Sequence, residues 1–206
     1  MLCAQTTGPD RIDQTPKEAT MPLPPPAPRD ELHTRRIEVR GYRRHDGLYE
    51  VEAHIVDTKA LPFPLQSRET VLPVGEHLHD MAIRLVFDKT YRVQEAVAAI
   101  DASPHVICPA AAASIAQLTG LSMGAGWGRA VREKLSGAQG CQHLTELLAQ
   151  MATIAFQTLA PLRHAEPARL DAKGRPVKID SCFAYASNRE LVRVRWPDHY
   201  DGPKMD

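Results

Sequence analysis

The chain has 206 residues, and its 25 basic and 25 acidic side chains give a formal net charge of zero. Apolar residues make up 43% and charged residues 24%, which is typical of a globular domain with one hydrophobic core. The charge balance excludes the basic excess of a general nucleic-acid-binding protein. No run reaches the ~18 apolar residues of a membrane-spanning helix.

The N-terminus has no basic segment followed by an apolar one, so it does not predict a secretory signal. The four cysteines are far apart in a chain of this length, whereas a disulfide scaffold would be denser and shorter. They are Cys3, Cys108, Cys141 and Cys182. We therefore expect a cytoplasmic protein with reduced thiols.

Residues 1–28 are polar and then proline-rich, ending in MPLPPPAPRD. Little of this segment can be buried, so it predicts a disordered or extended arm. Residues 29–206 are predicted to form a single α+β domain. Six arginines fall early in that domain, where they form either a basic patch or simply the solvated face of a hairpin. They are Arg29, Arg35, Arg36, Arg40, Arg43 and Arg44.

Two hairpins follow the arm. Apolar and polar residues alternate in 36–42 and again in 48–57, and Asp46-Gly47 lies between the two runs, which predicts a hairpin. A second hairpin is predicted from 81–87 and 92–100.

The apolar period then changes from two to about 3.6, which indicates helices. Helices are predicted over 109–118, 127–135 and 141–159, with Gly120, Gly137 and Pro161 marking their ends. The runs 176–185 and 190–196 predict a third, C-terminal hairpin. Strands first and helices later indicate an α+β fold, an antiparallel sheet of β-hairpins with three helices packed on one face.

Two cysteines lie at predicted helix starts, where free N–H groups and the helix dipole stabilise a thiolate. Cys108 precedes Pro109, and Cys141 follows Gly140. His77 and His79 are two residues apart and would project to the same face of an extended chain. Two imidazoles and two thiolates would make a tetrahedral zinc site. A cysteine at a helix start is often only a buried packing residue, and without a C-x-x-C pair the spacing is a weak signal for a metal site.

Other residues are weaker candidates. His143 is a spare ligand or a general base, and Asp101 with Ser103 would cap or orient the site before Cys108. A nucleophilic pair of Cys141 or Cys108 with His79 would use the same atoms without a metal. Cys182 lies in a strand-like run that predicts a core position. The glycine-rich loop at 124–128, with Arg129 and Arg132, either holds an anion or only connects two helices.

From residue 36 to 196 the chain resembles a proteobacterial family of unknown function, and the resemblance implies no activity. The motifs that carry it are Arg-Gly-Tyr-Arg-Arg with Asp-Gly at 40–47, His-Asp-Met at 79–81, Asp-Ala-Ser-Pro at 101–104 with Cys-Pro at 108–109, Gly-Trp at 126–127 with Arg-Ala-Val-Arg at 129–132, Gly-Cys-x-His-Leu at 140–144, and Trp-Pro at 196–197.

Residues 77–155 also resemble, more distantly, the U-type iron–sulfur cluster scaffold fold. His77-Leu78-His79 stands where that fold has Cys-Gly-Asp, and Cys108 and Cys141 stand at its second and third cysteines. The resemblance implies that these positions converge on one metal or cluster site. Histidines replace the first cysteine and the aspartate, and Gly140 replaces the last histidine. The loss of one thiolate favours zinc or a single iron over a transferable cluster.

We therefore predict a small metal-binding protein, a zinc or mononuclear iron enzyme acting on a small molecule as a hydrolase or lyase. His79, Cys108 and Cys141 would hold the metal, with His77 or water completing the site, and His143 and Asp101 would be catalytic. The alternatives are a metal-free cysteine–histidine enzyme and a non-catalytic scaffold or docking protein. No membrane partner is expected, and a homodimer is left open.

Overall fold

The computed structural model describes residues 23–65, 67, 69–164 and 167–203. The chain divides into two units, Met1–Glu31 and Leu32–Asp206. Residues 23–31 of the first unit are exposed and form neither helix nor strand, and the rest of the predicted arm, 1–22, lies outside the described residues.

A four-stranded antiparallel sheet forms the centre of this unit, in the order β1-β2-β5-β6. The first predicted hairpin is confirmed as β1 (His33–Arg43) and β2 (Tyr49–Lys59), both longer than the alternating pattern suggested. The second is confirmed as β5 (His77–Phe87) and β6 (Val93–Ala102). β2 pairs with β5, so the two hairpins make one continuous sheet.

The proline-containing loop between the two hairpins holds a further small hairpin that the sequence did not predict. β3 (Phe63–Leu65) pairs with β4 (Thr70–Leu72). Ser67 Oγ donates to the carbonyl of Pro104 at 2.6 Å, which joins this hairpin to the segment after β6.

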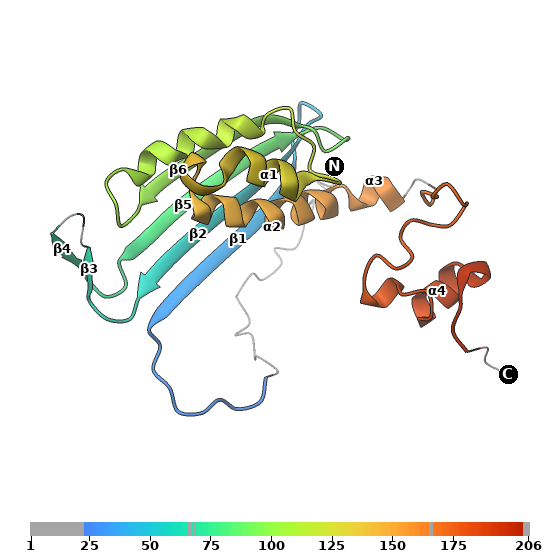
Figure 1. Ribbon diagram of the computed structural model, residues 1–206, viewed down its shortest axis with the longest axis horizontal. Coiled ribbons are helices and arrows are strands. Elements are labelled where there is room, and N and C mark those ends of the chain that lie inside the picture. The colour runs from blue at the N-terminus through green and yellow to red at the C-terminus, as the bar shows by residue number, and fades with distance from the viewer. Residues whose placement is uncertain (1–22, 66, 68, 165–166, 204–206) are drawn as a thin grey trace, which may run out of the picture. The chain divides into compact units, whose positions relative to one another are not determined.

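The three predicted helices lie on one face of the sheet, as Figure 1 shows. The first is a 3-10 helix, η1 (Cys108–Leu118); the others are α1 (Trp127–Leu135) and α2 (Gln142–Thr158). A short 3-10 turn, η2 (Gly137–Gln139), connects α1 to α2. The predicted α+β class is confirmed.

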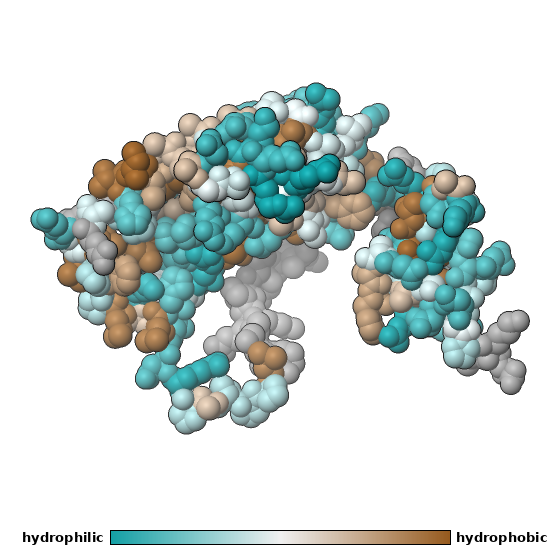
Figure 2. Space-filling view, viewed as in Figure 1, coloured by the Kyte–Doolittle hydropathy of each residue, from teal (hydrophilic) through white to brown (hydrophobic). Residues whose placement is uncertain are grey.

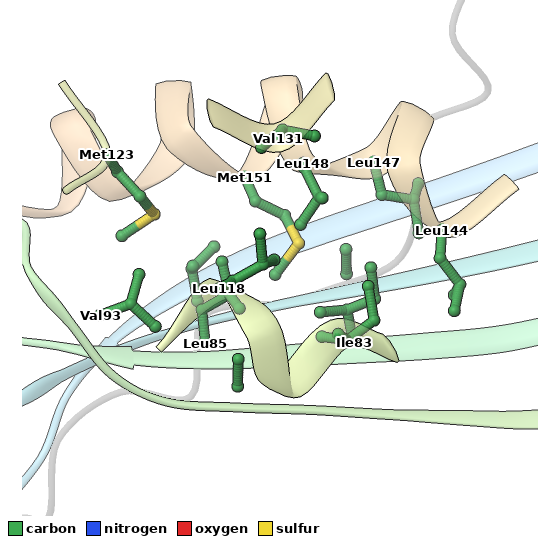
Figure 3. Close-up of a cluster of buried hydrophobic side chains, with 14 of the residues drawn as sticks. Ile83, Leu85, Val93, Leu118, Met123, Val131, Leu144, Leu147, Leu148 and Met151 are labelled. Atoms are coloured by element: carbon green, nitrogen blue, oxygen red, sulfur yellow. The ribbon is translucent and has the colours of Figure 1, made fainter. Parts of the chain in front are cut away.

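The core lies between the helices and the inner face of the sheet. In Figure 3, Leu144, Leu147, Leu148 and Met151 of α2 point toward Ile83 and Leu85 of the sheet. All six side chains are at most 2% exposed. Since burial of one such side chain contributes about 1.5–3 kcal/mol, this contact fixes α2 on the sheet.

A glycine lets α2 approach strand β1 closely. A Cβ atom on Gly41 would overlap Thr158 Oγ1 and lie within 3.4 Å of Ile154, and both of these residues belong to α2. Any side chain at position 41 would therefore push the helix away from the strand.

The predicted C-terminal hairpin is wrong, because the segment forms short helices instead. They are η3 (Phe183–Tyr185) and α4 (Glu190–Arg195), with α3 (Ala160–His164) earlier in the chain and η4 (Pro197–His199) directly after the segment. Glu190 pairs with Arg193 three residues on, a spacing that stabilises a helix and not a strand. Cys182, predicted to be a core residue, is exposed.

Candidate functional site

One end of the sheet carries a row of three charged or polar residues on its inner face. The register places Arg35 of β1 opposite Asp57 of β2, and Asp57 opposite His79 of β5. Asp57 continues the inward-facing series of β2, whose other members, Val51, Ala53 and Ile55, are core residues. A carboxylate therefore lies where the alternation of the strand would place an apolar side chain.

Asp57 is 1% exposed, and Arg35, His79 and His33 lie against it, with His33 Nε2 3.7 Å from Oδ1. Arg35 donates from Nε and Nη2 to its two oxygens, each at 2.8 Å. His79 Nδ1 lies 2.8 Å from Oδ2 of the same carboxylate. Burial alone would raise the pKa of Asp57, but the hydrogen bonds from Arg35 and His79 outweigh it and lower that pKa to about 2. The carboxylate is therefore ionised at neutral pH and accepts all three bonds.

His79 is consequently fixed in one tautomer. Because the ionised carboxylate can only accept, Nδ1 carries the proton, and Nε2 is left with its lone pair. Burial lowers the pKa of His79 more than Asp57 raises it. The ring is neutral at pH 7, which is the form that binds a metal or takes up a proton.

His143 of α2 lies against His79. The two ring centroids are 3.9 Å apart, with an angle of 37° between the planes. Burial lowers the pKa of His143, and the neighbouring His79 lowers it further. Among the described residues, Asp57, His79 and His143 are the set whose potential ligand atoms all lie within 4.8 Å of one another.

The start of α2 brings a thiol to the same place. Cys141 is the N-cap residue of α2, and its Sγ lies 4.0 Å from Nδ1 of His143. Glu146, one turn further along α2, accepts a hydrogen bond from Arg35 at 3.1 Å. Arg35 thus joins the helix to the buried carboxylate. The half-buried Cys141, predicted as a metal ligand, therefore contacts His143, predicted as catalytic, and His143 in turn lies against His79.

His77 does not lie on the same face of the sheet as His79. The register of β2 with β5 shifts between Asp57 and Thr58, which interrupts the regular alternation on which the same-face expectation rested. His77 Nδ1 instead lies 2.6 Å from Oδ2 of Asp80. Asp80 directly follows the inward-facing His79, so its side chain projects to the opposite face of the sheet. The expectation that His77 and His79 share a face is therefore wrong.

The other predicted residues lie outside the set formed by Asp57, His79 and His143. Cys108 is half-buried and begins η1, and Asp101 is exposed on β6. Neither belongs to the three-residue set found among the described residues. Ser103 is buried and donates to the carbonyl of His105, so it stabilises the turn before η1. Arg129 lies 3.9 Å from Glu133, an exposed pair on α1.

Asp57 and Arg35 were not among the predicted site residues. The alternation in strand β2 could have identified Asp57, because this aspartate follows three apolar residues, Val51, Ala53 and Ile55, at intervals of two. Once Asp57 is recognised as inward-facing, a cation opposite it on β1 is expected, since a buried carboxylate needs a partner.

The geometry defines an α+β protein with an Arg–Asp–His–His cluster, of which Asp57 and His79 are buried, beside a cysteine at one end of an antiparallel sheet. The chain belongs to the DUF2889 family, which is described as protein of unknown function and which matches residues 33–157. All members of the cluster fall within that range. No curated protein and no solved structure matches the chain. No helix in the described part of the chain is long and apolar enough to cross a membrane.

Proposed function

We propose that the protein is a small metal-binding enzyme whose zinc or iron ion is held by His79, His143 and Cys141. The observation that carries this proposal is the hydrogen bond between His79 Nδ1 and the buried Asp57. Metal-binding histidines almost always donate their second N–H to a carboxylate or carbonyl, which fixes the ring and raises its basicity. Here Nε2 of His79 is the nitrogen left for the ion.

Asp57 orients His79 and is not itself the ligand in this proposal. Both of its oxygens accept from Arg35, and one of them also accepts from His79. A metal at Asp57 would have to displace Arg35 and leave a guanidinium without its buried partner, which is costly. A metal at Nε2 of His79 disturbs none of these bonds.

His143 and Cys141 lie at the spacing of two ligands of one ion, while the three proposed ligand atoms do not all lie within 4.8 Å of one another, so a side chain would turn when an ion binds. Ligand atoms around a zinc ion lie about 3–4 Å from one another, and Cys141 Sγ is 4.0 Å from His143 Nδ1. Both histidines are neutral at pH 7, so binding releases no ring proton. The thiolate is favoured by its place at the start of a 17-residue helix.

Three protein ligands leave a fourth position for water, for the substrate or for the thiol of Cys108. Three ligands plus an open position is the pattern of catalytic zinc, and a bound ion would supply Lewis acidity and lower the pKa of a bound water. The reaction class that follows is hydrolysis or lyase chemistry on a small molecule.

The order of elements also supports the resemblance to the U-type scaffold fold. Strand β5 begins at His77, helix η1 begins at Cys108, and helix α2 begins just after Cys141.

A second candidate function is favoured by the same cysteine. The 4.0 Å approach of Cys141 Sγ to His143 Nδ1 also suits a cysteine nucleophile activated by a neighbouring base, with Asp57 and His79 behind it. The two functions differ in what they require. A nucleophilic cysteine would be alkylated rapidly by iodoacetamide at neutral pH, and added zinc would not protect it.

Metal analysis of protein purified without a polyhistidine tag tests the first proposal. We expect about one equivalent of zinc or iron per chain, retained on dialysis, and loss of that equivalent in H79Q and C141S. Less than about 0.2 equivalents of any transition metal, unchanged after zinc is added, would refute it and favour the cysteine enzyme or a non-catalytic docking role.

A further inference from the structure

A second carboxylate lies between two histidines on the outer face of the same end of the sheet. His54 Nε2 lies 2.6 Å from Oδ1 of Asp80, and His77 Nδ1 lies 2.6 Å from Oδ2. Asp80 is 22% exposed, and the two histidine side chains are 50% and 48% exposed. The residues come from the central strands β2 and β5, which hold their backbones rigidly.

Stability does not account for this arrangement. Exposed charge pairs contribute about 0–1 kcal/mol, and two histidines must be ordered to make both contacts. On the same face Arg84 pairs with Glu50 and Glu52, and the side chains hydrogen-bonded to Asp80 are His54 and His77. The carboxylate is kept ionised, because hydrogen bonds from His54 and then His77 lower the pKa of Asp80 against the effect of burial.

Two imidazoles and one carboxylate are the donors that zinc and its neighbours in the first transition row prefer. Nitrogen and oxygen ligands of one such ion lie about 3 Å apart, close to the separations seen between each ring and Asp80. The ligand atoms of the three residues do not all lie within 4.8 Å of one another, so the half-exposed rings would turn toward one another when an ion binds. Tautomerisation of an imidazole ring leaves a lone pair on the nitrogen that faces Asp80, so that nitrogen can serve as a ligand.

We propose that His54, Asp80 and His77 form a second, solvent-open site for a divalent transition-metal ion, with water in the remaining positions. This site lacks a thiolate and is exposed, so it binds more weakly than the inner cluster. It shares no residue with that cluster, and it stands whether or not the inner site holds a metal. One consequence is that His77, predicted as a ligand alongside His79, binds a different ion on the opposite face.

Zinc binding to the full chain without a tag, measured by calorimetry, tests the proposal in a background where the inner ligands are removed. The double variant C141S/H143Q is expected to bind about one zinc ion per chain. Adding H54Q and H77Q is expected to abolish that binding, and adding H45Q, an exposed histidine in the β1–β2 turn, is expected to leave it unchanged.

Cobalt separates the two sites in the wild-type protein. An ion bound at the inner site gives a thiolate-to-cobalt charge-transfer band, whereas an ion at the outer site gives none, since no cysteine is among its residues. If the inner proposal fails and the outer one holds, the wild-type protein binds one cobalt ion without a charge-transfer band. The H54Q/H77Q variant then binds no cobalt ion. Binding in the C141S/H143Q background that persists after H54Q and H77Q, or no binding in that background at all, would overturn the outer site. Circular dichroism confirms that each variant is folded.

Discussion

At one end of the sheet each face carries an aspartate paired with histidine, but the two aspartates differ in burial and in their other partner. On the inner face Asp57 is 1% exposed and is shared by Arg35 and His79; on the outer face Asp80 is 22% exposed and is shared by His54 and His77. Buried charge must be fully paired, so the inner set is tied into the fold. The outer set is solvated, so its histidines can be removed or redirected at little cost. Burial, more than residue type, decides which cluster supports the structure.

The largest expected difference between the faces is the effect on stability of removing each carboxylate charge. D57N should destabilise the protein by about 3 kcal/mol, because Arg35 loses its buried partner and His79 its acceptor. D80N should cost less than about 1 kcal/mol. Urea unfolding followed by circular dichroism measures both.

The same comparison extends to metal affinity. D57N should weaken zinc binding at the inner site by about 10- to 100-fold while leaving one ion bound at saturation, since an orienting residue is lost and no ligand is removed. Competition with a chromogenic chelator measures this shift. Unchanged affinity in a folded D57N protein would show that Asp57 does not orient His79 for a metal.

Acid should unfold the metal-free protein through the inner cluster. The pKa of Asp57 is about 2 in the folded protein against 3.8 unperturbed, so its stabilising contribution of about 2 kcal/mol is complete above pH 3.8 and is lost as the pH falls toward 2. The pKa values of His79 and His143 are also lowered when folded, so a separate loss begins as the pH falls below 6.5.

Urea midpoints measured from pH 8 to pH 3 test these two windows. H143Q should reduce the loss that begins below pH 6.5 and leave the loss below pH 3.8 in place. H45Q is the matched control, because His45 is exposed and has no part in the cluster. A wild-type profile that is flat from pH 7 to 5 would contradict the neutral histidine pair.

A shift of α2 should weaken zinc binding at the inner site and leave zinc binding at the outer site unchanged. G41A forces a Cβ against Thr158 of α2, and we expect a loss of about 1–3 kcal/mol with weaker zinc binding at the inner site. The double variant G41A/T158A removes the Oγ1 atom that the new Cβ would overlap and should recover part of both losses. Binding at the outer site, measured in the C141S/H143Q background, should not change.

The smallest expected effect is that of the outer histidines on folding. H54Q/H77Q should change the free energy of unfolding by less than about 0.5 kcal/mol in the absence of metal. Exposed side chains can form hydrogen bonds to water instead, so their bonds to Asp80 contribute little to stability. A larger loss would mean that the outer set is structural, like the inner one.

The sequence predicted the regular parts of the fold because their periodicities are strong. The alternation in β1, β2 and β5 and the leucine face of α2 gave the sheet and its helices. The β3–β4 hairpin was missed because each strand has three residues and one contains a proline, too short for a period. The C-terminal segment alternates like a strand, yet local pairing of Glu190 with Arg193 favours a helix.

The site was predicted only in part, because strand alternation was applied across an irregularity. His79, Cys141 and His143 were identified, and the structure places them together. His77 was assigned to the same face as His79, but the register shift beside Asp57 places the two on opposite faces. No local sequence pattern predicts that shift. Arg35 was grouped with five surface arginines, although its register opposite Asp57 makes it the partner of a buried charge.

Cobalt titration of wild type and of C141S is the most direct test of the inner metal site. The account predicts that wild type develops a thiolate charge-transfer band that saturates at about one equivalent, that C141S and H79Q lose the band, and that C108S still binds one ion. Absence of the band in folded, reduced wild-type protein, or a band that survives C141S and disappears in C108S, would contradict the assignment of Cys141, His79 and His143 as the metal ligands.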